Sequence, residues 1–406
     1  MKKSLLNSIL LLILFPFLII SCTDPFVLRT DNYEEAVVIE ATITNELKKQ
    51  EIKVSKTYKF EENGPTLIDD AVVNVTDSDG TVFEFEYNSG KYVSVNPFQA
   101  ETGKQYKLLV ITDNGKSYTS TNETLTTVNP IQDVVPTVTF KDGIRGVAMN
   151  VKSFDPTSSS KYYRFEYEET YKIIAPKWVS VKAVVTYTPP TNPIGTIDLI
   201  PRTTEARVCF SSDKSNNLLL TSTNNLNEDR VNFPVRFIKS NDYTIANRYS
   251  ILVRQYIQNL ASFTFYTTLK EISGSGSILS QNQPGFFSGN IKCVENTNEK
   301  VIGFFDVASV SSKRIFFNYN EVFPNEALPK YPYKCDINPE TPQENVFKFC
   351  FSPFDFTCQG YTVLSLLASE TYVYYDFYND SYELYPTPCG DCTSFSSNII
   401  PTFWID

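Results

Sequence analysis

The sequence predicts a mainly β protein, with an N-terminal immunoglobulin-like sandwich followed by a larger β-rich domain that contains one helix. Three observations lead to this fold class. Apolar and polar residues alternate in short runs such as Phe83-Glu84-Phe85-Glu86, a period typical of strands with one buried face. Asp-Gly and Asn-Gly pairs, typical of hairpin turns, follow or separate such runs. Residues 259–273 form the one convincing helical pattern.

The first 21 residues are predicted to be a signal peptide of the lipoprotein type. Two lysines precede a nearly unbroken apolar run from Leu5 to Ile20, which contains a proline and is shorter than the roughly 20 residues of a spanning helix. The run ends in Ile19-Ile20-Ser21-Cys22. This resembles the bacterial lipobox, in which a peptidase cuts before a cysteine that already carries a diacylglycerol. A plain secretory signal and an uncleaved anchor are the alternatives.

Cys22 is therefore the predicted lipidation site, and residues 22–35 are a polar tether. Each buried CH₂ group contributes about 0.8 kcal/mol to membrane binding, so two or more acyl chains anchor a protein stably. No second apolar run approaches the length of a span. We expect attachment to the membrane through the N-terminal lipid alone.

The composition narrows the possible chemistry. The net charge of −10 argues against a nucleic-acid partner, because phosphate binding needs clustered lysine and arginine. The chain contains no histidine. This excludes Ser-His-Asp and Cys-His catalysis, histidine-ligated zinc and HExxH hydrolysis. Mechanisms that use only carboxylates or a lysine remain.

Residues 36–130 are predicted to form the immunoglobulin-like sandwich. Strand patterns lie at 36–43 and 51–57, and the pairs Asp79-Gly80 and Asn114-Gly115 mark hairpin turns between later strands. About seven strands in about 90 residues are typical of this fold. The segment contains no cysteine, so no disulfide supports the prediction.

Residues 131–406 are predicted to form the larger β-rich domain, after a proline-punctuated boundary at 124–138. Longer strand patterns run to about residue 255, and the proline- and threonine-rich stretch 188–204 reads as a loop. In the helix at 259–273 an apolar face is expected to contain Leu260, Phe263, Tyr266 and Leu269. A cysteine-rich segment follows, and the aromatic run 371–378 reads as a strand.

The segment 75–86 has acidic residues at some offsets of a calcium-binding loop, with Asp77, Asp79, Gly80 and Glu86 in place. Its first ligand position is Val75 and strands flank it. A hairpin turn is therefore the preferred interpretation.

Seven cysteines follow Cys22 and are the candidates for disulfide bonds: Cys209, Cys293, Cys335, Cys350, Cys358, Cys389 and Cys392. Behind an export signal, disulfides are favoured over a Cys₄ zinc site or a redox CxxC motif at 389–392. An odd number implies at least one unpaired thiol. Cys209 and Cys293 could pair with each other, although spacing does not establish it.

Four carboxylates, Asp155, Glu166, Glu168 and Glu169, lie close in sequence to three tyrosines. Glycosidases need two opposed carboxylates about 5–10 Å apart, and neighbouring residues of a strand point to opposite faces. A solvated strand face is the preferred interpretation. The tyrosines at 372–378 could stack on sugars, but packing on the two faces of a strand is preferred.

Several segments together resemble a known family. They are "VVIEATITNE", "YYRFEYEETY", "NRYSILVRQY", "QPGFFSGNI", "VIGFFDVASVSSKRIFF" and the terminal "CGDC" with "IIPTFWID". In this order, and behind a lipobox, they resemble the outer-membrane lipoproteins of Bacteroidota classed as domain of unknown function 4249. The resemblance implies proximity to TonB-dependent transporters, beside which family members are commonly encoded. It implies no catalytic residue.

Two functional hypotheses follow. The first is a non-enzymatic lipoprotein, lipid-anchored in the outer membrane and exposed at the cell surface, that acts as accessory or ligand-capture partner of an outer-membrane β-barrel such as a TonB-dependent transporter. We expect no catalytic residue, metal or cofactor in it. The second is a stand-alone carbohydrate-binding, adhesive or carbohydrate-active surface protein, suggested by the aromatic strands and the acidic residues.

Overall fold

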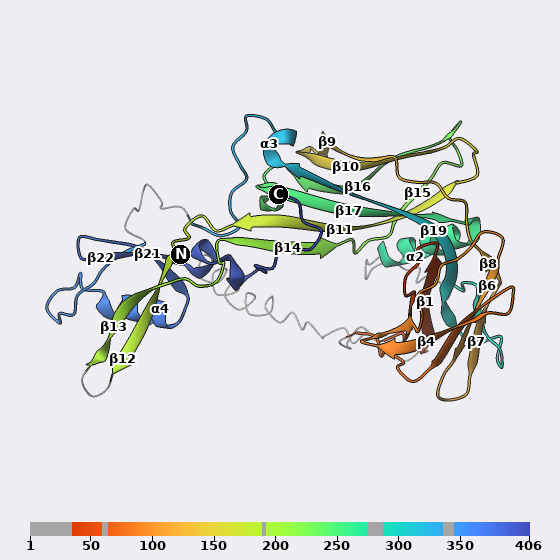
Figure 1. Ribbon diagram of the computed structural model, residues 1–406, viewed down its shortest axis with the longest axis horizontal. Coiled ribbons are helices and arrows are strands. Elements are labelled where there is room, and N and C mark those ends of the chain that lie inside the picture. Colours follow the sequence, from red (N-terminus) through yellow and green to blue (C-terminus); the bar gives the residue numbers. More distant parts are fainter. Residues whose placement is uncertain (1–34, 59–63, 189–191, 275–286, 336–344) are drawn as a thin grey trace, which may run out of the picture.

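The computed structural model describes residues 35–58, 64–188, 192–274, 287–335 and 345–406. The chain is elongated, with one β-rich unit at each end and a third between them (Figure 1). We call these units the N-terminal sandwich, the central sandwich and the C-terminal lobe. Strands dominate all three, so the prediction of a mainly β fold is confirmed, and the arrangement is compatible with a sandwich.

The N-terminal sandwich contains β1 (Val37–Thr44), β2 (Glu51–Lys56), β3 (Val72–Asp77), β4 (Val82–Asn88), β5 (Lys91–Ser94), β6 (Gln105–Ile111), β7 (Ser117–Ser120), β8 (Glu123–Thr124) and β18 (Ile291–Cys293). Its strands follow one path, β1-β2-β5-β4-β3-β6-β7-β18, around a single apolar core. Alternation explains which side chains enter this core. In β1, for example, Ile39, Ala41 and Ile43 are buried, whereas Glu40 between them is exposed.

The central sandwich contains β9 (Asp133–Lys141), β10 (Ile144–Asp155), β11 (Tyr162–Ile174), β14 (Val208–Lys214), β15 (Leu219–Ser222), β16 (Asp229–Lys239), β17 (Arg248–Gln258), η2 (Tyr243–Ile245), α2 (Leu260–Gly274) and α3 (Tyr319–Val322). The three-stranded sheet β16-β10-β9 covers one face of strands β14, β11 and β17. Their facing side chains form the largest apolar core, which includes Tyr163, Phe165, Val147 and Val151.

One long strand, β19 (Val301–Asn318), belongs to both sandwiches. Its first part pairs in parallel with β1, from Val37 opposite Val301 to Thr44 opposite Ala308. Its second part pairs antiparallel with β17. A continuous hydrogen-bonded strand therefore joins the two units and fixes their relative orientation.

Gly303 permits the closest approach of β19 to β1. A Cβ atom at this position would lie 2.2 Å from the carbonyl oxygen of Ile39. No side chain fits there, so glycine is required for this parallel pairing.

The C-terminal lobe contains β12 (Val181–Thr188), β13 (Asn192–Pro201), β20 (Val346–Lys348), α4 (Gly360–Ala368), β21 (Tyr372–Tyr378), β22 (Ser381–Pro386), α5 (Thr387–Gly390) and η3 (Cys392–Ser394). The hairpin β12–β13 and the sheet β20-β22-β21 pack around α4. The cluster of Cys335, Tyr385 and Cys389 packs beside this core, against Tyr331 and Tyr375.

Three details differ from the sequence prediction. Residues 192–201 form strand β13 within the stretch predicted to be a loop, because they pair with β12 in a hairpin. The predicted helix at 259–273 lies at α2, but α4 was missed. The division near residue 130 does not separate the two cores, because residues 291–307 contribute to the core of the N-terminal sandwich.

The face of α2 that packs inward agrees with the prediction in part, since Phe263 contacts Tyr162 and both Tyr266 and Leu269 line a hollow beside β1. Phe265 is buried, whereas Leu260 is 60% exposed. Phe265 contacts Phe287 and Phe304, which come from beyond the helix. Among the described residues, no helix combines the length and the apolarity needed to cross a bilayer.

Candidate ligand-binding groove

Six of the seven candidate cysteines form disulfide bonds. Cys209 pairs with Cys392, Cys335 with Cys389, and Cys350 with Cys358. Cys293 is a free, buried thiol. The suggested pairing of Cys209 with Cys293 is therefore wrong, because Cys293 lies in the core of the N-terminal sandwich and Cys209 in that of the central sandwich. Cys22, the predicted lipidation site, lies outside the described residues.

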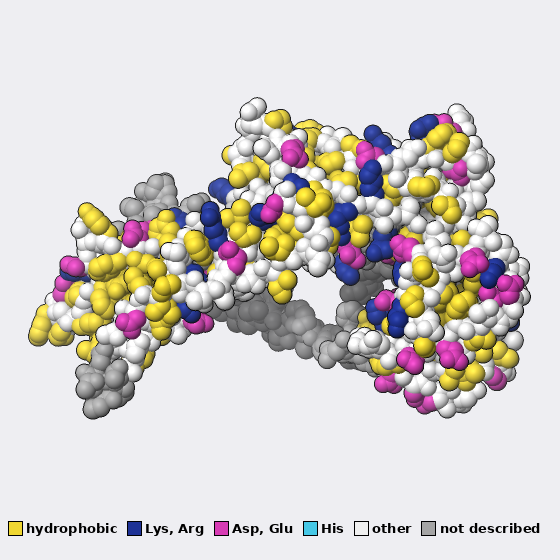
Figure 2. Space-filling model, viewed as in Figure 1, with side chains coloured by type: hydrophobic (Ala, Val, Ile, Leu, Met, Phe, Trp, Pro, Cys, Tyr) yellow, Lys and Arg dark blue, Asp and Glu magenta, His cyan; other side chains and the backbone are white. Residues whose placement is uncertain are grey.

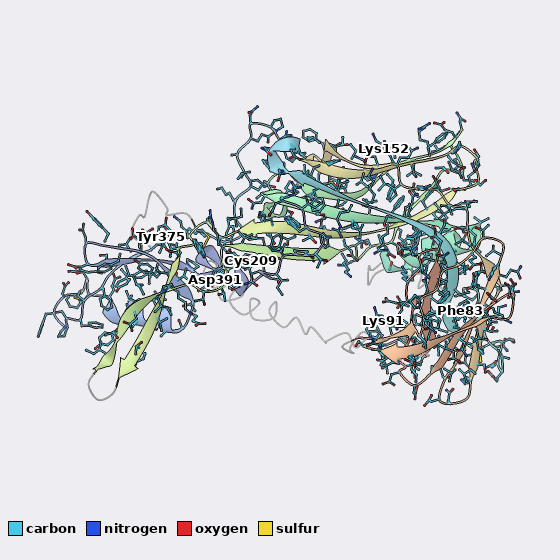
Figure 3. The ribbon with its side chains drawn as sticks, viewed as in Figure 1. Phe83, Lys91, Lys152, Cys209, Tyr375 and Asp391 are labelled. Atoms are coloured by element: carbon cyan, nitrogen blue, oxygen red, sulfur yellow. A yellow bond between two sulfur atoms is a disulfide. The ribbon has the colours of Figure 1, made fainter. Side chains whose placement is uncertain are left out.

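These bonds also decide the role of the CxxC motif. Cys389 and Cys392 pair with different partners, so they form neither a redox dithiol nor half of a Cys₄ zinc site. The disulfide between Cys209 and Cys392 ties the C-terminal segment to β14 of the central sandwich, where Figure 3 labels Cys209 close to Asp391. Arg202 also forms an ion pair with Asp391, with 2.9 Å between Nη1 and Oδ2.

The acidic segment at 75–86 is a hairpin between β3 and β4. Asp77 Oδ1 accepts hydrogen bonds from the backbone N–H groups of Asp79 and Thr81, at 3.0 and 2.9 Å. Lys104 lies 3.3 Å from Asp77 and 3.1 Å from Asp79. The carboxylates thus stabilise the turn and are neutralised by a lysine.

The carboxylates of β11 separate onto two faces. Glu166 and Glu168 lie on one face, whereas Glu169 is buried on the other. Glu169 accepts two hydrogen bonds from Arg236, at 2.9 and 3.0 Å, and one from the hydroxyl of Tyr249 at 2.5 Å. The expectation of a solvated face is therefore wrong for Glu169, because a fully paired network compensates its burial.

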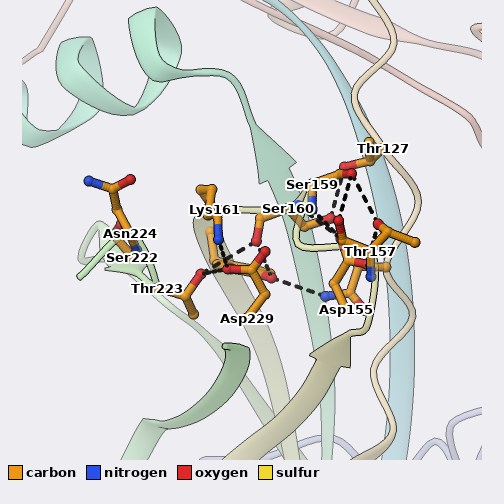
Figure 4. Close-up of polar contacts among 12 residues, drawn as sticks. Thr127, Asp155, Thr157, Ser159, Ser160, Lys161, Ser222, Thr223, Asn224 and Asp229 are labelled. Atoms are coloured by element: carbon orange, nitrogen blue, oxygen red, sulfur yellow. Dashed lines mark hydrogen bonds and ion pairs between the residues drawn. The ribbon is translucent and has the colours of Figure 1, made fainter. Parts of the chain in front are cut away.

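Asp155 is also buried, and it organises the loop between β10 and β11 (Figure 4). One carboxylate oxygen accepts from the amide and the hydroxyl of Thr157, at 2.9 and 2.6 Å, and the other accepts from the amide of Ser160 at 2.8 Å. Burial alone raises the pKa of Asp155, but these hydrogen bonds outweigh it and lower the pKa to about 2. Asp229, opposite Asp155 in the sheet, binds Lys161 at 2.6 Å. Asp155 and Asp229 therefore stabilise the fold around this loop.

The tyrosines of β21 mostly pack within the C-terminal lobe. Tyr374 contacts Tyr382, and Tyr375 contacts Tyr385, with ring centroids 6.1 and 5.3 Å apart. At the end of the strand the side chain of Tyr378 is instead 74% exposed. This agrees with packing of aromatic side chains as the main role of the run.

A groove lies where the N-terminal sandwich meets the central sandwich. Three adjoining hollows of about 280, 750 and 460 Å³ share lining residues and together form it. One wall comes from β1, β2 and the turn before β5, and the other from β11 and β17. Helix α2 and the start of β19 complete it. Because β19 belongs to both units, the groove is preformed.

Arg164 is the central polar residue of the groove. It lies on β11 directly opposite Tyr256 of β17, is 7% exposed and lines the two hollows of about 280 and 750 Å³. Its guanidinium carbon lies 4.2 Å from the ring centroid of Tyr256 and 5.0 Å from that of Tyr266, within reach of cation–π contacts. One terminal nitrogen donates to Glu166. Nε is buried and has no hydrogen-bond partner among the described residues.

A second buried charge lies near Arg164 on β19. Asp306 is fully buried, and one of its oxygens accepts from Gln258 at 3.3 Å while the other has no partner in the described part of the chain. Burial raises the pKa of Asp306, and the charge of Arg164 opposes this rise. Asp306 and Arg164 thus interact electrostatically, although Asp306 is not among the residues that line the three hollows.

The rim of the groove is basic. Five cations line the hollow of about 460 Å³, together with only Glu51 and Glu168: Lys48, Lys49, Lys91, Lys214 and Arg254. Figure 2 shows lysine and arginine gathered along the concave edge between the two sandwiches, and Figure 3 labels Lys91 on the N-terminal side. Even with Glu46, which contacts Lys48 and Arg254, cations outnumber acids. This local excess contrasts with the net charge of −10.

The groove residues were not predicted from the sequence. Glu166 and Glu168 were noted only as carboxylates, and Arg164, Tyr256 and Tyr266 were not candidates for a site. One signal was available. Arg164 interrupts an aromatic strand at a position whose neighbours Tyr163 and Phe165 are buried, and a central strand rarely carries an arginine without a partner.

A mainly β, disulfide-bonded protein with a sandwich-like fold is thus the class that the architecture defines. Residues 23–314 match the family described as "Domain of unknown function (DUF4249)", and the chain belongs to this family. No curated protein matches the chain. Among solved structures, a chain described as "Biofilm associated protein - BSP domain" is 9% identical with a TM-score of 0.13, over 70% of this chain and 59% of that one. A TM-score this low shows no shared fold.

Proposed function

We propose that the protein is a non-enzymatic outer-membrane lipoprotein that captures a ligand and works as a partner of an outer-membrane β-barrel, such as a TonB-dependent transporter. The observation that carries the proposal is the preformed groove with Arg164 at its centre. Aromatic and apolar side chains line the inner hollow together with charged ones, among them Arg164 and Glu166. Such a mixture can hold the body of a small molecule and orient its polar groups.

The N-terminal sequence supports the lipid anchor. Ser21-Cys22 stands at the end of an apolar run, in the order of a lipobox. A lipid at Cys22 would confine the protein to the membrane plane, where tethering raises the effective concentration of a barrel partner.

The C-terminal lobe supports association with another protein. Its large apolar side chains are unusually exposed: Phe354 by 91%, Phe356 by 99% and Tyr378 by 74%. Apolar side chains gather over this lobe in Figure 2. Clusters of exposed aromatic residues are typical of interaction surfaces.

The contacts of the carboxylates support a role without catalysis. Glu166 binds Arg164, Glu168 lies 3.5 Å from Lys214, and Glu169 is held by Arg236. A general acid or a nucleophile needs a carboxylate that is available to the substrate. These groups already neutralise cations.

The second candidate is a stand-alone carbohydrate-binding, adhesive or carbohydrate-active protein. Glu166 and Tyr256 favour it, because a carboxylate beside an aromatic ring in a groove is also a common feature of sugar sites.

Affinity purification separates the two functions. The tagged chain would be extracted from solubilised outer membranes, with a Cys22→Ala variant as the control that removes tethering. Recovery of a barrel protein in stoichiometric amount supports the first function. Its absence, together with binding or turnover of glycans by the isolated protein, would favour the second.

A further inference from the structure

The buried guanidinium of Arg164 has more hydrogen-bonding capacity than the protein uses. Arginine presents five N–H donors in a planar fork. Within the described part of the chain, Arg164 donates one hydrogen bond, to Glu166. Buried polar groups are almost always hydrogen-bonded, and an unpaired buried N–H is costly. The unpartnered Nε shows that the fork has spare donor capacity, on a side chain that lines the hollow of about 750 Å³.

Glu166 occupies one terminal nitrogen of Arg164 and leaves the other donors of the fork without a carboxylate from this residue. Its other oxygen accepts a hydrogen bond from the hydroxyl of Tyr256 at 3.0 Å, so the carboxylate is engaged on both sides. Tyr256 and Tyr266 hold the guanidinium plane in place from their ring faces. A planar acceptor with two oxygens matches a fork held in this way.

The walls around Arg164 combine apolar side chains with ion pairs, in which Lys53 contacts Glu40 and Lys91 contacts Glu51. The hollow of about 750 Å³ has the size of a small-molecule site. The apolar part of its lining includes Val38, Leu218, Phe265, Leu269, Ile302 and Phe304. An acid with no apolar body would leave these apolar side chains in contact with water. A ligand that carries an apolar chain or ring next to its acid group would cover them.

We propose that the groove binds an organic carboxylate with an apolar body, and that Arg164 holds the carboxylate. This inference rests on the proposed ligand-capture function and specifies its ligand class. The basic rim formed by Lys48, Lys49, Lys91, Lys214 and Arg254 attracts the anion, and the inner walls select its body. Fatty acids and aromatic acids share this chemistry.

Isothermal titration calorimetry on the full-length protein in neutral detergent tests the assignment. The probes are octanoate, 4-phenylbutyrate, the amide of each acid, and inorganic phosphate. We expect at least one acid to bind, its uncharged amide to bind at least about tenfold more weakly, and phosphate not to compete. The two acids distinguish an aliphatic from an aromatic source of the ligand.

Matched variants locate the binding. Arg164→Gln should weaken binding of the acid at least about tenfold, whereas Arg230→Gln should leave it unchanged, because Arg230 pairs with Glu228 away from the groove. If Arg164→Gln does not fold, Leu269→Trp serves instead, since a larger side chain at this lining position would fill the inner hollow while Arg164 itself is kept. The double variant Lys91→Gln/Arg254→Gln should weaken binding in dilute salt and much less in concentrated salt.

Three outcomes would overturn the ligand class: equal binding of acid and amide, competition by phosphate, or no binding of any probe. None of them affects recovery of a barrel protein with the tagged chain. Failure of the ligand class is therefore distinguishable from failure of the proposed function.

Discussion

Glu168 and Glu169 are adjacent in the chain, yet β11 places them in opposite environments. Glu168 lies on the groove face, where its side chain is 41% exposed and faces Lys214. Glu169 is buried against Arg236 and Tyr249. The period of a strand alone produces this contrast, and it makes the two residues a matched pair for mutation.

We predict that Glu169→Gln lowers the free energy of unfolding by about 3 kcal/mol, because it leaves the guanidinium of Arg236 without its counter-charge. Glu168→Gln, one residue earlier on an exposed face, should change it by less than about 0.5 kcal/mol. Urea unfolding followed by tyrosine fluorescence measures both. Similar losses for the two variants would contradict the assigned environments.

A second prediction concerns pH and Asp155. Its pKa is about 2 in the folded protein and about 3.9 in an unfolded chain. A lowered carboxyl pKa stabilises the fold above the unfolded value, and this contribution is lost as the pH falls through the folded value. We expect wild type to exceed Asp155→Asn by about 2 kcal/mol at pH 7 and by much less at pH 2.5. A difference that stays constant between these pH values would show that ionisation of Asp155 contributes nothing.

Strands that belong to local hairpins could be predicted from the sequence, whereas the pairing of a strand that belongs to both sandwiches could not. Alternation and turn residues predict β4, because Phe83 and Phe85 recur at a period of two and a Gly precedes them. The strand β19 was visible as a pattern, but nothing local shows that its two parts pair with β1 and β17. The pairing with β1 joins residues 264 positions apart, and the pairing with β17 joins residues 52 to 70 positions apart.

Cysteine pairing was open for the same reason. The sequence indicates that the cysteines are oxidised, but the partner of Cys209 is decided by the return of the C-terminal segment to β14, 183 residues later. Spacing does not encode that return.

The disulfides should differ in their contribution to stability. In the chain-entropy account, a loop of 183 residues contributes about 5 kcal/mol and a loop of 8 residues about 2.5 kcal/mol. We therefore expect Cys209→Ser/Cys392→Ser to lower the unfolding midpoint clearly more than Cys350→Ser/Cys358→Ser does. Thermal unfolding by circular dichroism ranks the two variants. The reverse order would indicate that local packing, and not loop closure, decides their effect.

At the scale of the whole molecule, the groove exists only because separate units meet. Its walls join β1 and β2 to β11, β17 and α2, which lie more than 100 residues further along the chain. Sequence reasoning could place Arg164 and Glu166 on one face of a strand, but not opposite β1. The sequence analysis noted Glu166 and Glu168 as carboxylates but did not identify the arginine or the groove.

The anchor is also a property of the whole molecule. We predict that Cys22→Ala yields a folded protein that no longer fractionates with membranes, because the lipid is the proposed attachment. Fractionation after a high-salt wash and circular dichroism of the released protein check this. A variant that stays with the membrane after the wash would mean that another part of the chain holds it there.

The association with a barrel is the central claim, and native mass spectrometry of the complex extracted in mild detergent tests it most directly. The account predicts a mass equal to that of the lipoprotein plus one outer-membrane barrel protein, in defined stoichiometry. It also predicts no glycan turnover by the extracted complex. A monodisperse monomer without a bound barrel, together with glycan turnover that Glu166→Gln abolishes, would contradict it.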